Sequence, residues 1–256
     1  MSLEQFTLKN KTILITGASG GIGKQTAITI SEAGAKVIVT GRNEENLLKT
    51  YHALIGNNHQ YIVADLCNED EIQDLAQQIN AVDGVVHGAG IVEHFPTKFI
   101  NRKKINNTFD VNFVAPVLLM TALFRYKKIK KNSSIVFISS RAGEFPYTSG
   151  ALYSASKIAL ESYSKTLSVE HIGIKMRSNA IAPAIVKSEM LNRTVELLNS
   201  LNSKAEIEKS SYLFGYGEPL DVANIILFLL SDASKWITGQ TIPLDGGYLR
   251  GLTSNL

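Results

Sequence analysis

Three polar residues near the middle of the chain have the types and spacing needed to move a proton. Tyr153 and Lys157 lie four residues apart, and positions i and i+4 of a helix share one face. A free phenol has a pKa of about 10, which a nearby cation lowers. Ser140 would add a hydroxyl that holds a substrate oxygen, if it ended a strand beside that helix. Together they predict acid–base chemistry on an alcohol or carbonyl, although the Tyr/Lys spacing alone also fits an ordinary surface helix.

A glycine-rich turn predicts a second site, which would bind a dinucleotide. An apolar run at residues 12–16 leads into TGASGGIG at residues 16–23 and then into a helical pattern. Glycines permit a tight turn and let backbone N–H groups and the helix N-terminus approach a pyrophosphate. The strand–turn–helix context makes this motif specific. The expected contacts are Gly17, Ser19, Gly20, Gly21, Ile22 and Gly23.

The end of the second apolar run indicates which dinucleotide is bound. An acid there would accept bonds from the adenosine ribose, whereas an arginine accommodates a 2′-phosphate. This chain has Gly41 followed by Arg42, which favours NADP(H) over NAD(H), although Arg42 could also be an exposed loop cation. Asp65 and the adjoining Leu66 follow the third run and are expected beside the adenine. Alternatively, Asp65 caps the helix that opens near Asn68.

Seven short apolar runs alternate with helical patterns and predict a parallel sheet that is covered on both faces. The runs are residues 12–16, 36–40, 60–64, 83–87, 134–138, 174–181 and 240–244. The clearest helical patterns are residues 22–33, a helix opening at 68–71, 106–126 with a bend or break at Pro116, 147–170 and 219–230. This alternation predicts an α/β fold, a single Rossmann-type doubly wound domain. Residues 187–217 break the rhythm and are expected to form a small helical substrate lid, or else a packed helical hairpin.

The composition fits a globular protein: of 256 residues, 45 % are apolar and 19 % charged, with a net charge of +3. Nucleic-acid binding, a membrane span and a metal site are not expected. Cys67 is the only cysteine, so an internal disulfide is impossible, which is consistent with a cytoplasmic location. A lysine cluster (Lys127, Lys128, Lys130, Lys131) is either a solvated helix end or a docking patch for an acidic partner.

The order of these motifs resembles the short-chain dehydrogenase/reductase family, in its classical form, over nearly the whole chain. The matching segments are residues 16–23, 87–90 (HGAG, similar to the family's Asn-Asn-Ala-Gly), Asn112, Ser140, Tyr153, Lys157, 179–184 (NAIAPA) and 245–247 (DGG). His87 and Gly88 replace two asparagines of the family pattern, and Ala184 replaces a glycine. Ser188 stands where a threonine is common.

The resemblance implies hydride transfer between the nicotinamide C4 and a carbonyl carbon. Tyr153 would be the general acid or base, and Ser140 would bond the substrate oxygen. Lys157 would lower the pKa of Tyr153 and bind the nicotinamide ribose, and Asn112 would hold a water that links Lys157 to solvent. The further cofactor contacts that it implies are Gly88, Ala89, Gly90, Pro183, Ala184, Val186 and Ser188.

The overall pattern looks like the 3-oxoacyl-acyl-carrier-protein reductase branch, so the substrate would be a small carbonyl compound or one bound to a carrier protein. The candidate substrate residues are Val92, Phe95, Glu144, Phe145, Tyr147, Met190 and Phe214. The alternatives are an NAD(H)-dependent alcohol or sugar dehydrogenase of the same family, or a non-catalytic NADP(H)-binding sensor. By analogy with the family, a homotetramer or homodimer is expected.

Overall fold

The computed structural model describes residues 3–192 and 212–248, which contain one seven-stranded sheet. All strands run parallel, in the order β3-β2-β1-β4-β5-β6-β7. The strands are β1 (Thr12–Thr16), β2 (Lys36–Gly41), β3 (Gln60–Val63), β4 (Val82–His87), β5 (Ile129–Ile138), β6 (Arg177–Pro183) and β7 (Thr241–Leu244). All seven predicted runs are strands, so the predicted Rossmann-type sheet is confirmed.

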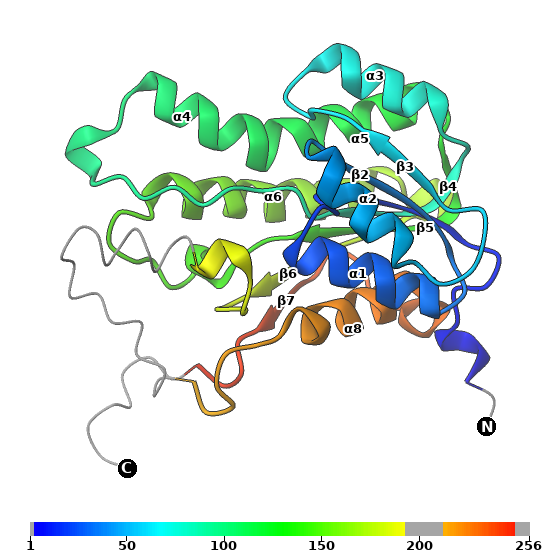
Figure 1. The fold of residues 1–256 in the computed structure, drawn as a ribbon. Coiled ribbons are helices and arrows are strands. Elements are labelled where there is room, and N and C mark those ends of the chain that lie inside the picture. The colour runs from blue at the N-terminus through cyan, green and yellow to red at the C-terminus, as the bar shows by residue number, and fades with distance from the viewer. Residues whose placement is uncertain (1–2, 193–211, 249–256) are drawn as a thin grey trace.

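The central strands β1, β2 and β4 are mostly apolar because both of their faces are buried, whereas the edge strands β3 and β7 are exposed or half-buried. Successive side chains point to opposite faces of a strand. In β1, Leu14 therefore packs into one core, whereas Ile13 and Ile15 pack into the other, and all three are fully buried. Helices α3, α5 and α6 contribute to the first core, and α1, α2 and α8 contribute to the second. Figure 1 shows the sheet between these two helical layers.

The helices begin and end close to where the sequence places them. They are α1 (Gly21–Glu32), α2 (Glu44–His52), α3 (Glu69–Gln78), α4 (Arg102–Phe109), α5 (Ala115–Arg125), α6 (Ala151–Glu170) and α8 (Pro219–Leu230). Asn68 caps α3 as expected, since its side chain accepts a hydrogen bond from the Asp70 backbone N–H. Helix α2, which is capped by Asn43, was not among the predicted helices.

The helix expected at residues 106–126 is interrupted at the point where Pro116 lies. A π-helical turn, Asp110–Val114, joins α4 to α5. In an α-helix the Asn112 carbonyl would accept a bond from the N–H of residue 116, which a proline does not have. The helix therefore widens here, and this turn carries the buried side chain of Asn112.

The continuous helical run Arg102–Arg125 is long and apolar enough to cross a membrane by length and hydropathy. The expectation that no segment approaches such a span is corrected by this finding. In the fold the run packs on the sheet, and Leu119, Met120 and Leu123 are fully buried in the first core. A core helix of this kind meets the same criterion as a membrane span.

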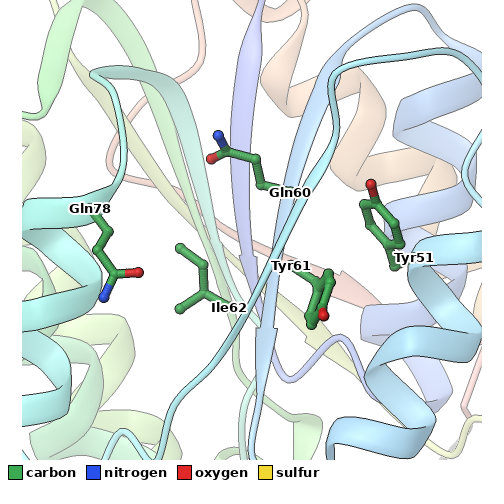
Figure 2. A pocket seen from close by; sticks show the side chains of 5 residues that line it. All are labelled: Tyr51, Gln60, Tyr61, Ile62 and Gln78. Carbon is green, nitrogen blue, oxygen red and sulfur yellow. The ribbon is translucent and has the colours of Figure 1, made fainter.

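A shallow hollow of about 330 Å³ lies on the edge strand β3, between α2 and α3 (Figure 2). It is lined by Tyr51, Gln60, Tyr61, Ile62 and Gln78. Gln60 is the first residue of β3, so the hollow lies at the amino ends of the strands. In parallel sheets, ligands bind beyond the carboxyl ends, so this hollow is not the predicted site.

The predicted lid at residues 187–217 falls mostly on residues 193–211, which lie outside the described residues, and it stays a prediction. Its two ends are described and meet in an isolated parallel bridge between Val186 and Gly217. This bridge sets the ends of the segment beside the carboxyl end of β6.

Candidate active site

The glycine turn after β1 and the segment after β4 are held together by Thr16. Its hydroxyl oxygen accepts hydrogen bonds from the backbone N–H groups of Gly88 (3.1 Å) and Ala89 (3.2 Å). Gly17 has a φ of +68°, and a Cβ there would lie 2.6 Å from the Ala89 nitrogen. Only glycine therefore lets the two segments meet at the switch point between β1 and β4.

The first turn of α1 is formed by Gly21, Ile22 and Gly23, and it is built to accept an anion. Gly20 is the N-cap, and no side chain caps the helix. No atom would approach a Cβ at Gly20 within 4 Å, so the backbone there is open. Uncapped N–H groups and the helix dipole attract negative charge. The residues present thus fit a dinucleotide pyrophosphate.

Arg42 lies beside Ser19 and Asp65 at the carboxyl end of β2. A Cβ at Gly41 would lie 2.3 Å from the Ser19 hydroxyl oxygen, which places Ser19 directly against this strand end. The Arg42 guanidinium is 4.0 Å from the Asp65 carboxylate, and their side chains are 60 % and 42 % exposed. Such exposed pairs contribute little stability, at most about 1 kcal/mol, so the guanidinium remains available to a ligand.

Asp65 is not the cap of α3, because Asn68 performs that role. The Asp65 carboxylate instead accepts a hydrogen bond from the Cys67 backbone N–H at 3.0 Å. Leu66 is buried in the first core, so only its backbone can face a ligand. Asp65 can therefore still contact the adenine, as predicted. Leu66 can contact it only through its main chain.

Ser140, Tyr153 and Lys157 converge at the carboxyl end of β5. Ser140 follows this strand by two residues and lies close enough to the Tyr153 phenol on α6 to lower the pKa of that phenol. The Lys157 ammonium donates a hydrogen bond to the Ile138 carbonyl at 2.9 Å and lies 5.8 Å from the centre of the Tyr153 ring. The proton-transfer group predicted from spacing is therefore assembled by two elements that pack against each other.

Burial decides the protonation of this group. It raises the pKa of Tyr153 above its usual value of about 10, and the hydrogen bond from Ser140 only partly offsets this. Burial also lowers the pKa of Lys157 to about 8. The expected lowering of the Tyr153 pKa by Lys157 is not what the structure gives, because burial is the largest influence on this pKa and the influence that opposes it comes from Ser140. Tyr153 is thus held as a neutral phenol, which is the proton-donating form.

The Asn112 side chain makes three hydrogen bonds within the protein, which gives it a structural role beside the expected one. Its amide nitrogen donates to the Ile91 carbonyl (3.0 Å) and to the Ser156 hydroxyl (3.1 Å). Its amide oxygen accepts from the Ile91 backbone N–H at 2.8 Å. This buried amide clamps the segment after β4 against α6. Both amide N–H groups are used, so a water that linked Lys157 to solvent would meet this side chain only at the second lone pair of its amide oxygen.

The segment after β6 lies against the glycine turn. Pro183 ends β6, and the Ala184 backbone N–H donates to the Leu244 carbonyl at 2.8 Å. Val186 follows at the bridge to Gly217. The Ser188 Cβ lies 3.7 Å from the position that a Cβ on Gly21 would take. The residues expected beside the nicotinamide are thus placed next to the pyrophosphate cradle. Gly90 faces the same space, since a Cβ there would lie 3.2 Å from both the Lys157 Nζ and the Asn112 Oδ1.

His87 fills the place of the first family asparagine with a ring stack. Its imidazole lies parallel to Phe137, with ring centres 4.5 Å apart, and the residue is 2 % exposed. Neither ring nitrogen finds a hydrogen-bond partner among the described residues. Burial lowers the pKa of His87 to about 3, so the ring is neutral at ordinary pH. A neutral ring stacked in the core is not placed to act on a substrate.

The candidate substrate residues separate into two groups. Burial raises the pKa of Tyr147, and the nearby Tyr153 raises it further. The Tyr147 ring centre is 5.6 Å from that of His94. Phe95 joins the same region, since its backbone N–H donates to the Ser149 carbonyl at 2.9 Å. Val92 is half-buried in the loop after β4. Met190 is 41 % and Phe214 87 % exposed, at the two described ends of the lid segment.

Glu144 and Phe145 instead surround Arg141, which the sequence reading missed. The Arg141 Nη1 pairs with the Glu144 carboxylate, and its Nε lies 3.1 Å from the Asp245 carboxylate. The guanidinium also lies over the Phe145 ring, 4.4 Å from its centre. A substrate hydroxyl would therefore meet a Glu144 that is already paired. The sequence signal that could have identified Arg141 is its position as a cation directly after Ser140, at the end of a predicted strand.

The lysine cluster lies at the opposite end of β5 from Ser140. Lys128 donates to the carbonyls of Ile79 (2.6 Å) and Gln77 (3.1 Å), and Lys130 pairs with Asp83 at 2.8 Å. A ten-residue strand spans about 30 Å, so within one chain this cluster is remote from the site. An acidic partner that docked on this cluster would therefore lie far from the active site of the same chain. Among residues 3–192 and 212–248, no group of three His, Cys, Asp or Glu side chains could hold a metal ion.

Comparison with known proteins agrees with this geometry. The profile of the family described as "Enoyl-(Acyl carrier protein) reductase" matches residues 17–249. The chain is 36 % identical to the 3-oxoacyl-[acyl-carrier-protein] reductase FabG of Rickettsia felis, over 94 % of this chain and 98 % of the relative. It is 33 % identical to the L-xylulose reductase of Caenorhabditis elegans, over 95 % and 97 %.

A solved structure supports the same assignment. The crystal structure of a short-chain type dehydrogenase/reductase from Mycobacterium marinum has a TM-score of 0.84 and 26 % identity, and covers 96 % of this chain and 98 % of that one. These matches extend over the glycine turn, the Ser140–Tyr153–Lys157 group and the last strand. The chain therefore belongs to the short-chain dehydrogenase/reductase family, whose oxidoreductases use a nicotinamide dinucleotide to interconvert a carbonyl and an alcohol.

Proposed function

We propose that this protein reduces a ketone or a 3-oxoacyl compound to an alcohol with NADP(H). The observation that carries this proposal is the convergence of Ser140, Lys157 and the neutral phenol of Tyr153 at the carboxyl end of β5. A bound nicotinamide dinucleotide would supply the hydride. The protein's own task is then to hold the substrate oxygen and to protonate it.

The three polar residues divide this task. Ser140 donates a hydrogen bond to the carbonyl oxygen and so orients it. Tyr153 transfers its proton to the same oxygen as negative charge develops there. Lys157, fixed by the Ile138 carbonyl, places a positive charge near the phenol and makes loss of its proton less costly in that step. Proton resupply would pass through Lys157 and the π-helical turn at Asn112.

The preference for NADP(H) is supported by Gly41 and Arg42. The 2′-phosphate of NADP(H) needs a cation to pair with and no acid at the strand end. Gly41 supplies no carboxylate there, and Arg42 is 60 % exposed with a 4.0 Å contact to Asp65. Uncapped N–H groups at α1 would hold the pyrophosphate of either dinucleotide, so Arg42 is the discriminating residue.

The substrate class is inferred from the relatives of this chain and not from a contact in the site. A relative named for 3-oxoacyl-carrier substrates and one named for L-xylulose are both about a third identical to this chain. We propose a small carbonyl substrate, free or carried on an acyl carrier, reduced by a cytoplasmic homotetramer or homodimer.

The exposed apolar side chains of Val169, Ile172 and Trp236 support self-association. Light scattering after gel filtration would test it, and a monomer at micromolar concentration would refute it.

The function is tested by following NADPH oxidation at 340 nm with a panel of carbonyl compounds. The panel includes simple ketones, hydroxyketones, ketoses and a 3-oxoacyl thioester. We expect turnover on at least one class, with NADPH preferred to NADH. Tight NADPH binding without turnover on any class would instead indicate a non-catalytic sensor.

A further inference from the structure

Arg141 follows Ser140 directly and is held by residues from two distant parts of the chain. Its Nη1 pairs with the Glu144 carboxylate, and its Nε lies 3.1 Å from the Asp245 carboxylate. The guanidinium also lies 4.4 Å from the centre of the Phe145 ring. The side chain is only 14 % exposed, so its neighbours fix this cation and pair it with two carboxylates.

The Ser140 hydroxyl is oriented by the short 3₁₀ turn Arg141–Gly143. Ser140 is the N-cap of this turn, and its Oγ accepts a hydrogen bond from the Ala142 backbone N–H at 3.2 Å. A serine hydroxyl has one proton to donate and two lone pairs. Because the turn uses one lone pair, the conformation of the turn decides where the proton and the other lone pair face.

This turn lies between α6 and the carboxyl end of β7. On one side Gly143 packs against α6, since a Cβ there would lie 2.3 Å from the Ile158 Cδ1. On the other side Arg141 reaches Asp245, the residue that follows β7. The contact with Ile158 only limits how closely the turn approaches α6, whereas the ion pair draws it toward β7. Arg141 therefore ties the turn to the end of the sheet.

Loss of either charge would release the turn. The Arg141 and Asp245 side chains are 14 % and 22 % exposed, so solvent screens their interaction only weakly. A partly buried charge without its partner is costly, so the remaining charge would move toward water and take its backbone with it. A displacement of about 1 Å near reacting atoms lowers a rate about 10²-fold. The ion pair can thus affect catalysis through the Ser140 hydroxyl.

We propose that Arg141 is a positioning residue for Ser140: paired with Asp245, it fixes the turn whose Ala142 N–H holds the Ser140 hydroxyl toward the substrate oxygen. This inference rests on the proposed function, since it concerns the carbonyl reduction assigned to the same site. Arg141 itself touches no reacting atom in this assignment.

The kinetic test compares Ser140→Ala, Arg141→Met and the double variant, with NADPH and a carbonyl compound that the wild type reduces. Arg141→Met should lower kcat about 10- to 100-fold and leave the Kd for NADPH nearly unchanged. The double variant should be no slower than Ser140→Ala, because Arg141 acts only through Ser140. Wild-type kcat in Arg141→Met overturns the proposal, and so does a double variant whose loss is the product of the two single losses.

Two further variants separate positioning from general stability. Arg141→Lys keeps a cation for Asp245, so its kcat should lie between those of Arg141→Met and the wild type. Arg177 is the matched control, since it is also buried and donates hydrogen bonds to Ser231 and Ser234 at the amino end of β6. Arg177→Met should lower stability but keep kcat of the folded enzyme. An equal loss of kcat in Arg177→Met and Arg141→Met contradicts the proposal.

Crystal structures of the NADPH complexes read the position of Ser140 without turnover. In Arg141→Met, or in Asp245→Asn if that variant does not fold, the Ser140–Ala142 hydrogen bond should be lost and the hydroxyl displaced by about 1 Å. This result supports the proposal even if no carbonyl is reduced, in which case only the proposed function fails. A hydroxyl that stays within about 0.5 Å of its wild-type place overturns it.

Discussion

The Lys157 ammonium lies 2.9 Å from the Ile138 carbonyl oxygen, at the strand end that leads to Ser140. This contact ties α6 to β5 and fixes the lysine beside the Tyr153 ring. The lysine is 5 % exposed, and burial lowers its pKa to about 8. The catalytic group thus consists of a neutral phenol and a cation that loses its proton readily, both positioned by the same strand.

Replacement of Tyr153 by phenylalanine should abolish proton donation and leave the cofactor cradle intact. General acid catalysis contributes about 10²- to 10⁴-fold, so kcat should fall within that range while the Kd for NADPH stays nearly unchanged. Steady-state kinetics and fluorescence titration measure the two quantities. Tyr163→Phe, also on α6, is the control. Near-wild-type turnover in Tyr153→Phe would remove the phenol from the mechanism.

Replacement of Arg42 by alanine should weaken NADPH binding about 10- to 100-fold, since a charge-assisted hydrogen bond is worth about 1.5–3 kcal/mol. NADH binding should hardly change, because NADH has no 2′-phosphate. Lys49→Ala, which removes another exposed and paired cation on the neighbouring helix α2, serves as the control. An equal loss for both dinucleotides would contradict the assignment of Arg42.

Replacement of Asn112 by alanine should destabilise the fold as well as lower activity. It leaves the Ile91 backbone N–H and carbonyl without their partner, at a cost of about 2–5 kcal/mol in the free energy of unfolding. Urea unfolding measures this loss. Asn107→Ala, on the preceding helix α4 with one exposed bond to Glu93, should cost less than about 1 kcal/mol. An Asn112→Ala protein of wild-type stability would restore a purely catalytic role.

His87 should make the fold sensitive to acid. Its pKa is lowered to about 3 in the folded state against about 6.5 in the unfolded chain. Below pH 6.5 the unfolded state therefore binds more protons, so stability falls as the pH drops from about 6.5 toward 3. Between pH 7 and pH 5 the loss from this residue should be about 2 kcal/mol.

Urea unfolding at both pH values checks this, and His87→Asn should flatten the dependence. The exposed His52→Asn should leave it as in the wild type. A wild-type slope that persists in His87→Asn would assign the acid sensitivity to other groups.

Arg141 and Asp245 should couple energetically although they are far apart in sequence. The Arg141 side chain is 14 % and that of Asp245 22 % exposed, so their interaction is only weakly screened. A double-mutant cycle with Arg141→Met and Asp245→Asn should give a coupling of about 1–3 kcal/mol in the free energy of unfolding. The exposed pair Lys49 and Glu45 should give about 0.5 kcal/mol or less. Equal couplings would show that Arg141 is not structurally special.

Local patterns along the chain determined the elements. Short apolar runs predicted all seven strands, although β6 also buries Arg177, Ser178 and Asn179, and the edge strand β3 is mostly exposed. Asn68 and Pro219 predicted where two helices begin, because capping and N-terminal proline act within one turn. The glycines after β1 and the Tyr153–Lys157 spacing are equally local, which is why the two halves of the site could be recognised in advance.

Only the tertiary structure decided how these local pieces act on one another. The direction of the shift in the Tyr153 pKa depends on burial, which the spacing of residues in the sequence does not reveal. The partners of Asn112 come from the loop after β4 and from α6, and the Arg141–Asp245 pair joins the turn after β5 to the end of β7. Hydrogen bonds and desolvation depend on distances between elements that folding brings together. Residue types and their spacing therefore determined which chemistry is possible, and tertiary packing decided the pKa values and the hydrogen-bond partners.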